Sequence, residues 1–138
     1  MDNELRRSII LEHYQNPLNK GLIEDNSYQK INVNNEGCID DIVLMVKIED
    51  NIIKDIRFDG EACAISTSAT SIMIKTLLNK SIDEVINIFN NYENMINEKE
   101  YDQNMIGECI VYNEIYKQPN RKKCALLPWI GLKRALKK

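Results

Sequence analysis

Three cysteines of this chain stand in short segments whose residue types suit metal binding. They are Cys38 in Cys38-Ile39-Asp40, Cys63 within residues 60–66, and Cys124 within residues 121–125. Three thiolates and one carboxylate, here that of Asp40, are the ligand count of a tetrahedral zinc site. The cysteines are 25 and 61 residues apart, so they do not form the Cys-x-x-Cys knuckles of a zinc ribbon. Such a site must therefore be assembled by tertiary folding.

The three cysteine segments together resemble one family, the U-type iron-sulfur cluster assembly proteins, which are IscU-, SufU- or NifU-like. Gly60 and Ser66, on either side of Cys63, stand at positions that match the family. The N-terminal Glu12-His13-Tyr14-Gln15-Asn16-Pro17-Leu18-Asn19-Lys20-Gly21 is similar to the family's Asp-His-Tyr-x-x-Pro-Arg-Asn-x-Gly. The resemblance covers essentially the whole chain.

The surroundings of the last cysteine distinguish two branches of that family. The scaffold branch has a His just before this cysteine and a Leu-Pro-Pro-Val-Lys motif before that, whereas this chain has Lys123 and lacks the motif. The sequence Cys124-Ala-Leu-Leu-Pro-Trp129 resembles the Cys-Ala-x-Leu-x-Trp of the other branch, and the segment between Cys63 and Cys124 is long. The resemblance therefore favours the SufU-like, zinc-binding branch.

Membership of that branch implies sulfur transfer in iron-sulfur cluster biogenesis. Zn²⁺ would be held by Cys38, Asp40, Cys63 and Cys124, and a SufS-like cysteine desulfurase would supply a persulfide. Cys38 would accept the sulfur, freed when a histidine of the desulfurase replaces it on the metal. In the scaffold branch Cys124 would be the acceptor, and the same ligands would hold a transient [2Fe-2S] cluster for downstream assembly or acceptor proteins.

Two further functions fit the cysteines without sulfur transfer. One is a non-catalytic, zinc-stabilised interaction domain. The other is a thiol redox protein, which the absence of a Cys-x-x-Cys pair disfavours.

The sequence offers two candidates for the carboxylate ligand, Asp40 and Asp41. Ile39 stands where the family motif Cys-Gly-Asp has glycine, and a β-branched residue would be strained at a positive φ. Either the loop differs or Gly37 supplies the flexibility. Asp41 is the alternative to Asp40.

Other candidate residues have ordinary explanations beside the chemical one. The basic residues before Cys124 are expected to stabilise its thiolate, and Arg121 either approaches that sulfur or is a surface charge. Cys63, among small residues, is either a ligand or a buried thiol. Cys109 lies on an apolar stripe and is expected in the core. His13, the sole histidine, is expected to be a partly buried helix residue hydrogen-bonded to a loop.

Length and charge set the broad class. The 138 residues fit one domain spanning 1–138, and the net charge of −3 does not indicate a nucleic-acid partner. No apolar run is long enough to cross a membrane, and the N-terminus is unlike a signal peptide, so we expect a cytoplasmic protein with reduced cysteines. All 21 acidic residues precede residue 119, and the last twenty residues carry seven basic ones. They form either a solvated helix face or a basic surface that offsets the site's negative charge or steers an acidic partner.

The residue patterns predict an α+β fold, a small three-stranded antiparallel sheet with helices packed on one face and a helix at each terminus. Strands are expected at 28–33, 41–48 and 52–58, with a two-residue turn at Asp50-Asn51. Helices are expected over 2–15, after Ser66–Ser68 as candidate N-caps, from the capping box at Ser81, over about 103–117, and after Pro119. Pro128 predicts that the last helix starts after Cys124 or kinks there. The three cysteines would then meet at one end of the sheet.

Overall fold

The computed structural model, which describes residues 1–137, has the predicted α+β architecture, with the sheet order β1-β2-β3. The strands are β1 (Gln29–Asn34), β2 (Asp41–Glu49) and β3 (Ile52–Glu61). The helices are α1 (Asn3–Gln15), α2 (Ala64–Leu77), α3 (Ile82–Ile96) and α4 (Pro119–Leu136), and three short 3₁₀ helices, η1 (Gln103–Met105), η2 (Gly107–Tyr112) and η3 (Ile115–Lys117), join α3 to α4. No helix of the described chain is long and apolar enough to cross a membrane.

The sheet forms as the alternation of apolar residues predicts. Both strand pairs are antiparallel, and the inward-facing Ile42, Leu44 and Val46 of β2 are fully buried. Asp50 and Asn51, at φ 54° and 62°, adopt the left-handed geometry of a two-residue hairpin turn. The hairpin places the start of β2 and the end of β3 at the same edge of the molecule, next to α2.

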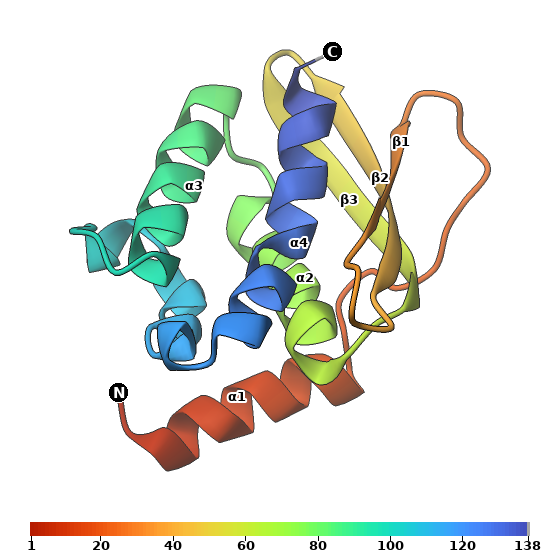
Figure 1. The fold of residues 1–138 in the computed structure, drawn as a ribbon. Helices are drawn as coiled ribbons and strands as arrows, with labels where there is room; N and C mark the ends of the chain where they lie inside the picture. Colours follow the sequence, from red (N-terminus) through yellow and green to blue (C-terminus); the bar gives the residue numbers. More distant parts are fainter. Residues whose placement is uncertain (138) are drawn as a thin grey trace.

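The helices cover one face of this sheet, as Figure 1 shows, with α4 (blue) between α3 and the strands and α1 (red) below. Helix α4 packs closely because Gly131 faces the sheet, where an added Cβ would lie 2.8 Å from Leu44 Cδ1. Trp129 of the same helix stacks on Tyr92 of α3 with ring centroids 4.6 Å apart. The close contact fixes α4, and with it Cys124, relative to both the sheet and α3.

One expectation about the helices is wrong. Helix α2 begins earlier than predicted, because Cys63 is its N-cap and Ser66–Ser68 are buried within its first turns. The helical segments expected over about 103–117 are the three short 3₁₀ helices. Helix α4 begins at Pro119, as expected, and continues through Pro128, so it does not start after Cys124, which lies in its second turn. The capping box at Ser81 is confirmed, since Ser81 and Glu84 bond reciprocally.

Candidate metal centre

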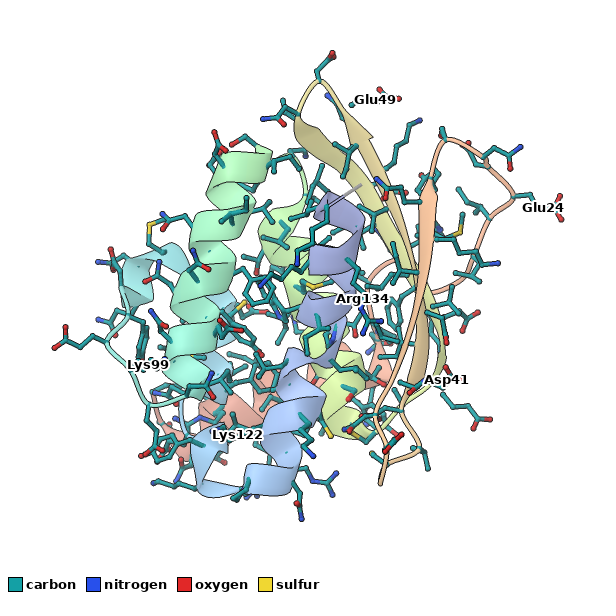
Figure 2. All side chains as sticks on the ribbon, turned by 45° about the horizontal axis from the view of Figure 1, so that its top comes forward. Glu24, Asp41, Glu49, Lys99, Lys122 and Arg134 are labelled. Atoms are coloured by element: carbon teal, nitrogen blue, oxygen red, sulfur yellow. The ribbon has the colours of Figure 1, made fainter. Side chains whose placement is uncertain are left out.

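Four candidate ligands from different parts of the chain meet at one end of the sheet. One ligand atom from each of Cys38, Asp40, Cys63 and Cys124 lies within 4.8 Å of all the others. Cys38 and Asp40 come from the loop between β1 and β2, Cys63 caps α2, and Cys124 comes from α4. In Figure 2, Asp41 at the start of β2 and Lys122 on α4 lie toward this end, while Glu49, next to the hairpin turn, lies at the opposite end.

The loop that carries Cys38 is held by its own backbone. The Cys38 N–H donates to the Asn35 carbonyl at 3.2 Å, and the Asn35 N–H donates to the Asp40 carbonyl at 3.1 Å. Gly37 takes the positive φ of 87°, and Ile39 does not, which resolves the strain that the Ile39 replacement raised. Ile39 instead points outward, with 66% of its surface exposed.

The loop also distinguishes the two neighbouring carboxylates. Asp40 is 2% exposed and belongs to the cluster, whereas Asp41 is exposed and accepts a bond from Asn32 Nδ2 at 2.8 Å. Burial opposes ionisation of Asp40. The Cys63 N–H, at 2.7 Å, and the Ser66 hydroxyl, at 2.5 Å, nevertheless donate to its oxygens and lower the pKa of Asp40. The geometry thus favours Asp40 as the carboxylate of this site.

Cys63 occupies a position where the backbone donates to its sulfur. It is the N-cap of α2, and its sulfur accepts from the Ser66 N–H at 3.4 Å. The N–H groups of a first helical turn donate to the capping side chain, here the Cys63 sulfur. Gly60 precedes it at φ 126°, where a side chain would overlap the backbone of Asp41. The turn into Cys63 therefore depends on glycine.

Cys124 is deeper in the protein than its basic neighbours suggest. It is 1% exposed, and burial together with Cys63 and Asp40 raises the pKa of its thiol to about 12. Burial thus outweighs the cations that were expected to activate this cysteine. Arg121 is exposed, and its guanidinium contacts the Cys124 sulfur. This contact raises the pKa of Arg121.

A cleft of about 280 Å³ lies between Cys38 and Cys124. It is lined by the loop that carries Cys38 and by the first turns of α4, including Arg121, Lys123 and Cys124. A reactant at Cys38 would therefore meet positive charge supplied by α4.

Cys109 and His13 lie outside the cluster. Cys109 is 1% exposed and belongs to the core, as predicted. His13 is more buried than expected, and it contacts helices rather than a loop. Its Nδ1 lies 2.7 Å from Ser71 Oγ on α2, and its Nε2 lies 2.5 Å from Glu108 Oε1 on η2. His13 therefore attaches α1 to α2 and η2 through two hydrogen bonds.

Replacing His13 with alanine is expected to lower the free energy of unfolding by about 2 kcal/mol, because it leaves Ser71 and Glu108 without this partner. Urea denaturation followed by far-UV circular dichroism measures the change. Arg7→Ala, at an exposed position of α1, is the control and should change stability by less than about 0.5 kcal/mol. Equal effects of the two substitutions would contradict this role of His13.

Two residues touch the cluster in ways that the sequence did not predict. Asn35 Nδ2 donates to Cys124 Sγ at 3.6 Å, and no feature of the sequence pointed to it. Ser66 matches a family position and is a candidate N-cap in the sequence, but its place between Asp40 and Cys124 was not predicted. Its spacing of three residues from Cys63, one turn of a helix capped by that cysteine, is the signal that could have found it.

The donor set suits zinc. Two sulfurs bound to one Zn²⁺ lie about 4 Å apart, because Zn–S bonds are about 2.3 Å long. The separations of up to 4.8 Å in this cluster need only small adjustments to reach that geometry. Three thiolates and one carboxylate also match the ligand types of zinc sites.

Comparison with known proteins identifies the family. The family model described as NifU-like N terminal domain matches residues 5–125, which include all four candidate ligands. The chain belongs to the NifU-like N-terminal domain family. The resemblance found in the sequence is thus confirmed.

Other members of the NifU-like family match nearly the full chain. The zinc-dependent sulfurtransferase SufU of Bacillus subtilis (strain 168) is 34% identical over 135 residues, which are 97% of this chain and 90% of that protein. The iron-sulfur cluster assembly scaffold protein IscU of Streptococcus pyogenes serotype M1 is 31% identical over 99% of this chain and 85% of its own. The crystal structure of a putative scaffold protein for the SUF system, FiSufU of Fervidobacterium islandicum AW-1, superposes with a TM-score of 0.86 at 33% identity, covering 91% of each chain.

Proposed function

We propose that this protein is a zinc-dependent sulfur acceptor in iron-sulfur cluster biogenesis, which takes persulfide sulfur from a SufS-like cysteine desulfurase. The observation that carries the proposal is the meeting of three sulfurs and one carboxylate, from segments far apart in sequence, within 4.8 Å. The similarity to a protein named as a zinc-dependent sulfurtransferase supports it over 97% of the chain. The reducing cytoplasm, where cysteines stay as thiols, is the proposed location.

Cys38 is the proposed acceptor. It is half-buried on a loop, whereas Cys124 is buried in a helix, so a partner can reach Cys38 with less rearrangement. The Cys38 thiolate attacks the terminal sulfur of the partner's persulfide and forms a new S–S bond. The partner's S–S bond breaks and its cysteine leaves as a thiolate, so the transfer needs no external oxidant or reductant.

The other residues of the site would bind the zinc ion or offset the negative charge of its ligands. Zn²⁺, held by Cys38, Asp40, Cys63 and Cys124, would keep the three thiols deprotonated and has no redox chemistry of its own. Arg121 lines the cleft between Cys38 and Cys124, where its positive charge offsets the negative charge of the ligand set. Ile39, beside Cys38 and exposed, must be covered by any partner that brings a persulfide to this sulfur.

A scaffold role is the second candidate. The similarity to proteins named as IscU scaffolds favours it, because the same donors could hold a nascent [2Fe-2S] cluster for transfer to downstream acceptor proteins. Cys124 would then accept the sulfur. Lys123 in place of histidine before Cys124 weighs against this candidate.

The purified protein is expected to contain one zinc ion per chain, which Cys63→Ser removes because it takes away one of the three thiolates. Elemental analysis of the two samples gives the metal content. Cys109→Ser is the matched control, since Cys109 is a core thiol outside the cluster, and it should retain zinc.

The same samples test the function. Adding the zinc-loaded wild-type protein to a SufS-like desulfurase and cysteine should raise alanine production, and adding the Cys63→Ser protein should not. If the zinc-loaded protein does not raise alanine production, the protein is a non-catalytic, zinc-stabilised interaction domain instead. A bound [2Fe-2S] cluster in anaerobically purified protein, seen by its visible absorption, would support the scaffold role instead.

A further inference from the structure

The hydroxyl of Ser66 touches all three segments that supply the candidate ligands. Its oxygen lies 2.5 Å from Asp40 Oδ2, 3.2 Å from the Cys124 carbonyl oxygen and 3.6 Å from Cys63 Sγ. Ser66 itself is fully buried in the first turn of α2.

The Cys124 carbonyl can accept a hydrogen bond from Ser66 because residue 128, one turn later in α4, is proline. In an α-helix, the carbonyl of residue 124 would accept from the N–H of residue 128. Residue 128 is proline, which has no N–H, and α4 nevertheless continues past it. Pro128 thus leaves the Cys124 carbonyl without its helical donor, and Ser66 supplies one in its place.

Ser66 therefore has one proton and two acceptors. The hydroxyl can donate to Asp40 Oδ2 or to the Cys124 carbonyl, and both lie within hydrogen-bonding distance. An ionised carboxylate oxygen has two lone pairs, so Asp40 Oδ2 can accept from Ser66 and still present a lone pair to a cation. The hydroxyl can thus orient the carboxylate both before and after a metal binds. The other oxygen, Oδ1, stays fixed by the Cys63 N–H at 2.7 Å.

We propose that Ser66 is a positioning residue of the metal centre, which orients the Asp40 carboxylate and ties it to the backbone of α4 at the carbonyl that Pro128 leaves open. The inference rests on the proposed zinc site and names a residue that acts on the metal through ligand residues it contacts, above all Asp40. Groups that hold metal ligands in this way commonly contribute 10- to 100-fold to metal affinity.

Zinc affinity, measured by competition with a chromophoric chelator at fixed pH, tests the proposal. Ser66→Ala is expected to weaken zinc binding by about 10-fold or more. Ser68→Ala is the matched control, because Ser68 is equally buried on α2 but its hydroxyl bonds to Tyr112 Oη and the Ile65 carbonyl. It should leave zinc affinity unchanged. Thermal unfolding of the metal-free proteins reports any general loss of stability separately.

A second pair of variants isolates the hydroxyl. Threonine and valine have nearly the same shape, so Ser66→Thr should bind zinc about 10-fold more tightly than Ser66→Val. In an Asp40→Asn background, Ser66→Ala should have little further effect, because the carboxylate that Ser66 orients is gone.

Three results would overturn the inference. They are equal losses from Ser66→Ala and Ser68→Ala, equal affinities of Ser66→Thr and Ser66→Val, or an undiminished effect of Ser66→Ala when Asp40 is asparagine. Each leaves the zinc site itself in place. A wild-type protein that binds no zinc would overturn the proposed function together with this inference.

Discussion

Replacing Cys38 with serine is expected to abolish sulfur acceptance from a cysteine desulfurase. The hydroxyl of serine cannot form the S–S bond that a persulfide needs, and loss of a covalent nucleophile commonly lowers the rate by at least about 10³-fold. Mass spectrometry of the protein after turnover with desulfurase and cysteine, without added reductant, detects the extra sulfur. Peptide mapping assigns it to one cysteine.

Two further variants make this result specific. Cys109→Ser should still gain one sulfur, because Cys109 is buried in the core and burial raises the pKa of its thiol to about 12. Cys124→Ser removes one candidate ligand but keeps the acceptor. If the added sulfur maps to Cys124 in the wild-type protein and persists in Cys38→Ser, the acceptor is that of the scaffold branch. Sulfur on none of the cysteines would remove the transfer mechanism.

Replacing Gly60 with alanine is expected to lower the free energy of unfolding by about 3 kcal/mol or more, through steric overlap and strain. The new Cβ would overlap the carbonyl oxygen of Asp41, and φ is 126° at this position. Both faults lie three residues before Cys63, so we also expect weaker zinc binding. Urea denaturation and chelator competition measure the two effects.

Gly37→Ala is the matched control for that substitution. Gly37 also has a positive φ, 87°, but an added Cβ would meet nothing within 4 Å. Only backbone strain remains, which costs about 1–2 kcal/mol for an L-residue. A loss from Gly37→Ala as large as that from Gly60→Ala would contradict the steric argument at Gly60.

The basic residues near the end of the chain place positive charge beside the candidate metal site. The seven basic residues of the last twenty are spread along α4 and beyond it, and Arg121 and Lys123 face the cleft next to Cys38 and Cys124. Their charge opposes that of three thiolates and a carboxylate. The rest of α4 includes Lys133, whose ammonium lies over the Phe89 ring at 5.5 Å, so this charge also serves packing.

Local patterns predicted most of the elements, because each depends on short-range chemistry. The alternation in β2, the turn at Asp50-Asn51 and the capping box at Ser81 each involve neighbours along the chain. The pattern over 103–117 predicts helical segments without their type, because apolar spacing does not separate an α-helix from successive 3₁₀ turns. Pro128 suggested a helix start or a kink, but α4 begins before it and continues through it, and Ser66, from another helix, lies 3.2 Å from the carbonyl that proline leaves without its helical donor.

For the candidate site, the sequence alone determined the donor types and the family, because both depend only on the residue types in short segments around Cys38, Cys63 and Cys124. Tertiary structure decided which carboxylate joins them, how deeply Cys124 is buried and what role Ser66 takes. These three depend on contacts between segments more than twenty residues apart. Such contacts follow from how β2, α2 and α4 pack together, and no local pattern of residues specifies them.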